Sequence, residues 1–192
     1  NGSTDRSREI AHDTGCRVVP VSERGYGAAL RAGIEASAGE YVMFADSDNT
    51  YLYGDSARLY AAACGEDADM AIASRLTGRI MPGAMPFLHR WLGTPVLTWL
   101  INRLFHGRLS DCNSGFRCVR KAAFNTWQIR SNGMEFASEL LIKALKSNAR
   151  AVEIPSGLRK GPEQAATPRR PGALLLDGET QGYGVNRSAP SL

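Results

Sequence analysis

The sequence predicts an α/β domain in which a mostly parallel β-sheet is flanked by helices. Three observations predict this class: short apolar runs have the length of buried strands, glycine-bounded helical segments separate them, and the two kinds of segment alternate. Connections of this kind are right-handed crossovers between parallel strands. The chain has 192 residues, of which 43% are hydrophobic and 22% charged, so one substantial core is expected.

The first half of the chain carries the clearest alternation. A polar turn at its start, with Ser3 or Thr4 as the helix cap, leads into a helix that ends at Gly15. The run EYVMFAD is too continuously apolar for a half-exposed edge strand, so we expect it inside the sheet. The expected strands are 17–21, 40–46 and 68–74, and the expected helices between them are 25–39 and 55–64.

The second half changes character after a loop at 75–86 that contains glycines and prolines. We expect a long apolar-rich helix at 87–106, a loop running into a strand at 112–119, an amphipathic helix at 133–147 and a closing strand at 149–155. Residues 1–155 therefore form the predicted core. The remainder, 156–192, is basic and rich in proline and glycine, which predicts a flexible arm.

Charge and cysteine content limit the binding partners and the cellular compartment that we expect. A net charge of +4 is compatible with binding to phosphates, to an anionic membrane face or to nucleic acid, but no aromatic-plus-glycine recognition motif supports the last. The four cysteines form no Cys-x-x-Cys pair and no secretory signal precedes them, which predicts reduced thiols in the cytoplasm. No apolar run reaches the roughly 20 residues of a membrane-spanning helix. Because the chain begins at Asn1 with no strand before the first turn, we expect an amino-terminal segment to be missing.

The candidate metal site is the pair Asp46 and Asp48 in FADSDNTY. Ligands bind beyond the carboxyl ends of strands in open α/β sheets, and this pair directly follows a predicted buried strand. Two carboxylates suit Mg²⁺ or Mn²⁺, which take few protein ligands and complete their shell with water and substrate phosphates. The alternative is a solvated turn, since Asp-x-Asp also occurs by chance. The position after the apolar strand favours the cation site.

Two glycine-bearing turns are candidates for binding an anion. NGSTDRS offers hydroxyls and an aspartate near a helix start, and ERGYGAALRAG places Arg24 and Gly27 at the start of the next helix, where backbone N–H groups favour a phosphate. Neither is a P-loop or a dinucleotide fingerprint. Ordinary helix capping remains the alternative for the first turn.

Four blocks together resemble family-2 glycosyltransferases: NGSTDRS, GYGAALRAGIEASAGEYVMFADSDNTY, DCNSGFRCVRKAAF, and GMEFASELLIKAL with VEIP. The resemblance covers roughly residues 1–160 and is strongest to the dolichyl- or polyprenyl-phosphate sugar transferases. It implies a GT-A fold, an inverting displacement, a nucleoside-diphosphate sugar donor and a divalent metal. The chain departs from the family in lacking the first strand with its Pro-x-x-Asn-Glu segment, and in carrying Thr50 where some relatives have glutamine.

The resemblance also implies roles for individual residues. Asp46 and Asp48 would hold the metal and the diphosphate, with Asp48 and Arg75 as the catalytic pair. The donor nucleotide would lie near the first turn, and we add the second turn to it, so that the donor residues are Asn1, Gly2, Ser3, Asp5, Arg24 and Gly27. The acceptor side would comprise Ser74, Arg75, Ser114, Arg117 and Glu135. To these we add Arg90, with Arg79 as a further cation, because arginine suits bidentate contacts with a phosphate.

The acceptor decides what chemistry is needed. A sugar hydroxyl needs a general base, whereas a polyprenyl phosphate is already ionised near pH 7 and needs cations to position it. The helix at 87–106 carries Trp91, Trp99 and several leucines flanked by arginines, which suits an interfacial membrane contact on the cytoplasmic face; alternatively its apolar side packs onto the sheet. Glu135 and Glu139 lie one helical turn apart and either bind substrate or form a solvated face. The competing functions are a truncated inactive relative, a transferase to a sugar hydroxyl, and a nucleotidyltransferase.

Overall fold

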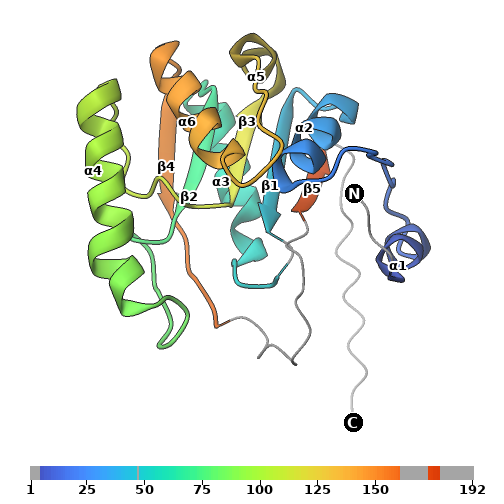
Figure 1. Ribbon diagram of the computed structural model, residues 1–192, viewed down its shortest axis with the longest axis horizontal. Coiled ribbons are helices and arrows are strands. Elements are labelled where there is room, and N and C mark those ends of the chain that lie inside the picture. The colour runs from blue at the N-terminus through green and yellow to red at the C-terminus, as the bar shows by residue number, and fades with distance from the viewer. Residues whose placement is uncertain (1–4, 47, 161–172, 178–192) are drawn as a thin grey trace.

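The computed structural model describes residues 5–46, 48–160 and 173–177 (Figure 1). The helices and strands lie in the order α1 (Ser7–Asp13), α2 (Tyr26–Ala36), β1 (Tyr41–Asp46), η1 (Tyr53–Asp55), α3 (Ser56–Gly65), β2 (Met70–Ser74), η2 (His89–Gly93), α4 (Thr94–Phe105), β3 (Arg117–Arg120), α5 (Lys121–Trp127), α6 (Phe136–Lys146), β4 (Ala151–Pro155) and β5 (Ala173–Asp177). The α/β class and most of the expected elements are confirmed; α5 and β5 were not expected.

The sheet has the order β4-β2-β3-β1-β5 and is mixed rather than mostly parallel. Of the strand pairs among the described residues, β2 and β4 are parallel, whereas β1–β3, β2–β3 and β1–β5 are antiparallel. The strands β1, β2 and β4 do point in one direction, as crossovers require. The prediction fails because β3 enters the sheet between β1 and β2 in the opposite direction.

Two further expectations are wrong. Residues 17–21 form no strand: they have no ladder partner among the described residues, and Pro20 lacks an N–H group for a ladder. The arm predicted at 156–192 is not unstructured throughout, because residues 173–177 pair with β1 as strand β5 and residues 156–158 are buried. The composition of this segment does not reveal that residues 173–177 pair with β1, because the pairing depends on a distant strand.

The alternation of side chains along β1 divides the core into two layers. Val42 and Phe44 pack with α2, α5 and α6 on one face, and Tyr41, Met43 and Ala45 pack with α3 on the other. In Figure 1, α2 and α6 lie in front of the sheet. The carboxyl end of β1 therefore emerges between two packed layers, which fixes the backbone that carries Asp46.

Helix α4 stands at one edge of the molecule (Figure 1). It buries two of its polar side chains and exposes most of its apolar ones. The side chains that it buries are Thr94, Thr98 and Ile101. Its tryptophan and most of its leucine and valine side chains are exposed. Most of its apolar side chains therefore face away from the core, although Ile101 belongs to the core and Phe105 packs against it. Within the described part of the chain, no helix is long and apolar enough to cross a membrane.

Candidate functional site

The carboxylate pair lies where β1 ends. The Tyr26 hydroxyl, on the first turn of α2, donates a hydrogen bond to Asp46 Oδ1 at 2.9 Å, and the Tyr53 hydroxyl donates to the Asp46 carbonyl. Asp48 lies in the exposed turn that follows, where its Oδ1 accepts bonds from the Thr50 amide (3.0 Å) and the Thr50 hydroxyl (2.7 Å). In each carboxylate, the oxygen Oδ1 is thus held by the protein.

Burial raises the pKa of Asp46, and the charge of Asp48 raises it further, while the Tyr26 hydrogen bond and the charges of Arg117 and Arg75 lower it. Asp46 is half-buried and lies within electrostatic reach of a second carboxylate. Such a pair is stabilised by a cation between or beside its members.

The carboxylate of Asp46 lies so close to Gly115 that a side chain at this position has no room. A Cβ at this position would lie 3.0 Å from Asp46 Cγ and closer still to Oδ2, so any other residue would displace the carboxylate. The Gly115 amide donates to the Tyr51 hydroxyl at 2.6 Å, which holds the loop in place. Among the described residues there is no cluster of three or more His, Cys, Asp or Glu side chains. Two carboxylates, one half-buried and one exposed, fit Mg²⁺ or Mn²⁺, whose remaining ligands are water and phosphate.

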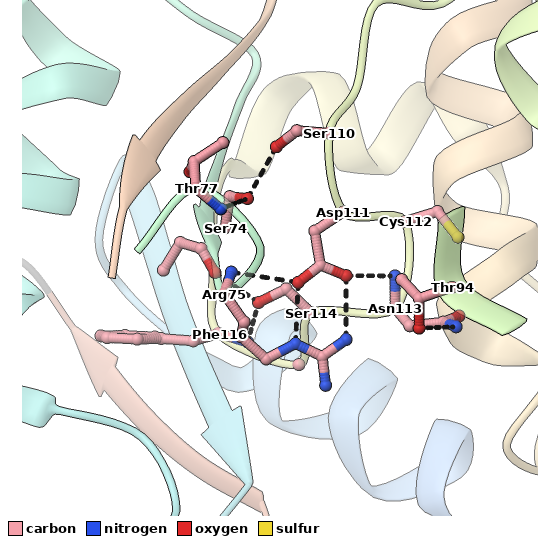
Figure 2. A network of polar contacts seen from close by, with 12 residues as sticks. Ser74, Arg75, Thr77, Thr94, Ser110, Asp111, Cys112, Asn113, Ser114 and Phe116 are labelled. Atoms are coloured by element: carbon pink, nitrogen blue, oxygen red, sulfur yellow. Dashed lines mark hydrogen bonds and ion pairs between the residues drawn. The ribbon is translucent and has the colours of Figure 1, made fainter. Parts of the chain in front are cut away.

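Arg75 follows β2 and forms a two-pronged ion pair with Asp111 (Figure 2). Its Nε donates to Asp111 Oδ2 at 2.7 Å and its Nη2 to Oδ1 at 2.8 Å, and the Arg75 amide donates to Oδ2 at 3.0 Å. Burial alone would lower the pKa of Arg75, but the hydrogen bonds and charge of Asp111 outweigh it and raise that pKa. Arg75 is therefore a permanently charged group held in one orientation.

The partner Asp111 is itself fixed. Its Oδ1 accepts a bond from the Asn113 amide at 3.1 Å, and the Glu153 carboxylate on β4 accepts bonds from the amides of Ser110 (2.8 Å) and Asp111 (3.3 Å). Sequence reasoning missed both acids. Asp111 opens the DCNSGFR block and could have been found there, but nothing in the sequence of β4 distinguishes Glu153 from a solvent-facing strand residue.

The SGFR block does not present its side chains to a ligand. The Ser114 hydroxyl is buried and donates to the Ala73 carbonyl at 2.6 Å. Arg117 is 1% exposed, and its guanidinium donates to the carbonyls of Ser114 (2.8 Å), Ala137 (3.0 Å) and Cys112 (2.9 Å). The predicted acceptor-binding roles of both residues are therefore wrong, because both groups are enclosed and already bonded.

Other acceptor-side predictions have different outcomes. Ser74 is fully buried and shares a 2.6 Å hydrogen bond with the Ser110 hydroxyl, so it too is enclosed (Figure 2). Arg90 is exposed on η2, with its guanidinium 5.2 Å from the centre of the Trp91 ring. Glu135 is exposed at the start of α6 and accepts a bond from the Gly133 amide, which fits capping of the preceding turn. Arg79 is exposed in the loop after β2.

The donor-side predictions are not brought together by the described residues. The carbonyl of Asn132 accepts a bond from the Ala28 amide, so a protein group occupies the start of α2 where we expected a phosphate. A Cβ on Gly27 would lie 2.5 Å from the Ser131 carbonyl oxygen. Close packing against Ser131, rather than contact with a phosphate, therefore accounts for glycine at this position. Arg24 is exposed.

Asp5 is exposed and accepts a bond from the Ser7 amide at the start of α1, a helix without buried residues that stands apart from the sheet (Figure 1). Its place near the donor nucleotide stays a prediction. Asn1, Gly2 and Ser3 lie outside the described residues.

The sequence model described as "Glycosyl transferase family 2" matches residues 1–127. The chain belongs to this family. The low-salt glycan biosynthesis hexosyltransferase Agl6 of Haloferax volcanii is 40% identical over 144 residues, which are 75% of this chain and 35% of that protein. The glycosyltransferase AglJ of the same organism is 31% identical over 183 residues, 91% of this chain and 58% of that protein. This family-2 chain thus spans only part of these relatives.

A third relative, a dolichyl-phosphate hexose transferase of Haloferax volcanii, is 27% identical over 190 residues, 98% of this chain and 76% of that protein. Among solved structures, the glucosyl-3-phosphoglycerate synthase of Mycobacterium tuberculosis, in complex with Mn²⁺, uridine diphosphate and phosphoglyceric acid, superposes with a TM-score of 0.63 at 21% identity, over 85% of this chain and 58% of that one. The likeness establishes the GT-A fold of this family-2 glycosyltransferase.

Proposed function

We propose that this chain is the catalytic core of an inverting hexosyltransferase that uses a nucleoside-diphosphate sugar, Mg²⁺ or Mn²⁺, and a polyprenyl-phosphate acceptor. The observation that carries the proposal is the pair of carboxylates at the end of β1, with Asp46 close against Gly115 and within electrostatic reach of the fixed cation Arg75. The relative named a dolichyl-phosphate hexose transferase and the Mn²⁺ and uridine diphosphate of the solved structures support the same reading.

In this reaction, an oxygen of the acceptor phosphate forms a bond to the anomeric carbon as the bond to the nucleoside diphosphate breaks. The leaving diphosphate takes the electron pair of that bond. Asp46 and Asp48 would hold a divalent cation, which would supply positive charge for this leaving group. Tyr26 and Thr50 orient the two carboxylates, and Arg75 supplies the second positive charge, for the acceptor phosphate.

The arrangement of the carboxylates favours a phosphate acceptor over a sugar hydroxyl. A hydroxyl must lose its proton to a general base. In the described part of the chain, the carboxylate beside Arg75 is Asp111, which is fully buried and bonded to the Arg75 guanidinium and to backbone amides. A group bonded in this way is a poor base. A phosphate needs none, since its second pKa is about 6.

The exposed apolar side of η2 and α4 supports a lipid acceptor. We call this surface the apolar face; its members are Phe87, Leu88, Trp91, Leu92, Val96, Leu97, Trp99, Leu100 and Leu104. The sequence has no Asp or Glu between Asp69 and Asp111, whereas this stretch contains five arginines. An apolar surface in a purely basic setting is complementary to a bilayer with anionic headgroups. We propose that it rests on the cytoplasmic face of a membrane, beside the loop that carries Arg75.

Transfer of radiolabelled hexose tests the reaction. UDP- and GDP-hexoses are offered with a short polyprenyl phosphate, or with a free oligosaccharide, in Mg²⁺, Mn²⁺ or EDTA. We expect metal-dependent transfer to the polyprenyl phosphate that falls about 100-fold in Asp48→Asn. The matched control Asp13→Asn, on exposed α1, should be unchanged. Transfer to the oligosaccharide alone, or an Asp48→Asn variant as active as wild type, would contradict the proposal.

Sedimentation with vesicles tests the membrane contact. Vesicles of phosphatidylcholine with about 30% phosphatidylglycerol should bind the wild type, and Trp99→Glu should weaken binding about tenfold or more. The matched control is Met134→Glu, because Met134 is 63% exposed and Trp99 64% exposed, but Met134 lies outside the apolar face. Equal losses of vesicle binding in both variants would contradict a membrane contact at the apolar face. So would a wild type that binds no vesicles but forms a concentration-dependent dimer that Trp99→Glu abolishes.

A further inference from the structure

The segment that follows β4 lies between two loops of the proposed site. Residues 156–158 are buried, although their composition predicts a flexible arm. We call residues 156–159 the brace. On one side of the brace is the turn that carries Asp48, and on the other is the loop at 75–86, which begins with Arg75 and which we call the acceptor loop.

Backbone hydrogen bonds join the brace to the acceptor loop. The Leu158 amide donates to the Arg79 carbonyl and the Met81 amide donates to the Leu158 carbonyl, both at 3.0 Å. The brace also approaches this loop more closely than a side chain allows, since a Cβ on Gly78 would overlap the backbone of Ser156. These contacts fix the acceptor loop along several residues.

A second set of contacts joins the brace to the carboxylate turn. The Arg159 amide donates to the Thr50 carbonyl at 2.7 Å, and Leu158 forms an antiparallel bridge with Tyr51. Thr50 is the residue whose amide and hydroxyl hold Asp48 Oδ1. Tyr51 accepts the bond from Gly115, the glycine beside Asp46. The brace is therefore linked to Asp48 through Thr50, and to Asp46 through Tyr51 and Gly115.

The Leu158 side chain fills the space between these two sets of contacts. It is 5% exposed and belongs to the core cluster that contains Tyr51 and Phe116, against which Ile80 of the acceptor loop also packs. A displacement of either loop thus changes the packing around Leu158, and close-packed interiors transmit such displacements.

We propose that the brace is a positioning element that couples the acceptor loop to the metal-binding carboxylates, so that the two loops open and close together. This inference rests on the proposed function for the identity of the two loops. It assigns Leu158 and the Arg159 amide a role in setting the position of Arg75 relative to Asp48. Neither residue touches substrate in this role.

Amide hydrogen exchange of the whole 192-residue chain, followed by mass spectrometry without added ligand, tests the coupling. Arg159→Pro removes the N–H that bonds to Thr50 and leaves Leu158 intact, and proline favours an extended residue before it. We expect exchange at Met81 to rise about tenfold, together with exchange at Thr50, although the deleted bond touches only the carboxylate turn. Arg159→Ala is the matched control, because it removes the exposed side chain and keeps the N–H; it should exchange like wild type.

A second variant guards against local unfolding by proline. Leu158→Ala should raise the rate of amide exchange in both loops relative to the rate in β1. Leu140→Ala is an equal truncation in the other core layer, and it should leave the ratio of the loop exchange rates to the β1 exchange rate unchanged. In steady-state transfer, Leu158→Ala should raise the KM for donor and acceptor by a similar factor, because one element positions both. Faster exchange in only one loop, or an equal effect of Arg159→Ala, would overturn the coupling. Since the exchange needs no turnover, loss of the coupling and failure of the proposed reaction give different results.

Discussion

Replacement of Arg117 tests whether this residue stabilises the core or binds the acceptor. Its guanidinium is enclosed and bonded to three backbone carbonyls, and burial lowers its pKa while surrounding groups such as Tyr26 and Tyr51 raise it. We expect Arg117→Met to fold into the same structure with a much lower free energy of unfolding. The substitution keeps much of the side-chain volume and removes all three donors.

The magnitude follows from those three bonds. Hydrogen bonds from a charged donor contribute roughly 1.5–3 kcal/mol each, so about 4–9 kcal/mol is lost in total. Removal of a buried cation offsets part of this loss, and broken buried charge networks cost about 3–5 kcal/mol. In a chain of this length each kcal/mol lowers Tm by about 2–4 °C, so we expect a fall of about 10 °C. The Tm of Arg117→Lys should lie between those of the wild type and Arg117→Met, because one ammonium group cannot donate to the three carbonyls that the planar guanidinium reaches.

Urea and thermal unfolding followed by tryptophan fluorescence measure the effect. Arg90→Met is the matched control: the same substitution at an exposed arginine should change the free energy of unfolding by less than about 0.5 kcal/mol. If Arg117→Met unfolded at the wild-type midpoint and instead raised only the KM for the acceptor, the assignment of Arg117 to the core would be refuted.

Three further outcomes are expected. Asp111→Asn should lower the free energy of unfolding by about 3 kcal/mol and should couple with Arg75→Gln by about 1–3 kcal/mol in a double-mutant cycle; additive effects would contradict the ion pair. Gly115→Ala should displace the Asp46 carboxylate and weaken Mn²⁺ binding, measured by electron paramagnetic resonance, about 10- to 100-fold, whereas unchanged affinity would contradict a role in metal binding for the carboxylate that lies against Gly115. Burial opposes the charge of Glu139, but hydrogen bonds from Lys143 and from backbone amides outweigh it and lower the pKa to about 2. Because the folded pKa lies below the ordinary value of 4.5, the stability lost in Glu139→Gln should be complete above about pH 4.5 and should vanish as pH falls toward 2; a pH-independent difference in urea midpoints would contradict this.

Much of the fold could be predicted because its signals are local. The run at 40–46 is apolar at nearly every position, and the structure places a strand there whose last residue is Asp46. The glycine-bounded helix at 25–39 and the amphipathic helix at 133–147 are confirmed for the same reason. Strand β5 was missed because its order depends on pairing with β1, more than a hundred residues earlier.

The site was predictable in part. Asp46 and Asp48 stand out because two acids directly follow a buried strand, and both lie at the carboxyl end of β1 as expected. The amphipathic face of α4 was visible in the sequence, but its direction was not. Only the tertiary contacts turn Thr94 and Thr98 inward and leave Trp99 exposed.

By itself, the sequence determined the α/β class, the family and the place of the carboxylate pair, since each is expressed in residues that are neighbours along the chain. The tertiary structure decided which polar groups are enclosed. Arg75 and Arg117 are both arginines that follow or begin a strand, yet one pairs with Asp111 and the other with the carbonyl of Ala137. The oxygen atoms around each guanidinium decide whether it is enclosed, and some of them come from residues 20 and 36 positions away, which no local pattern predicts.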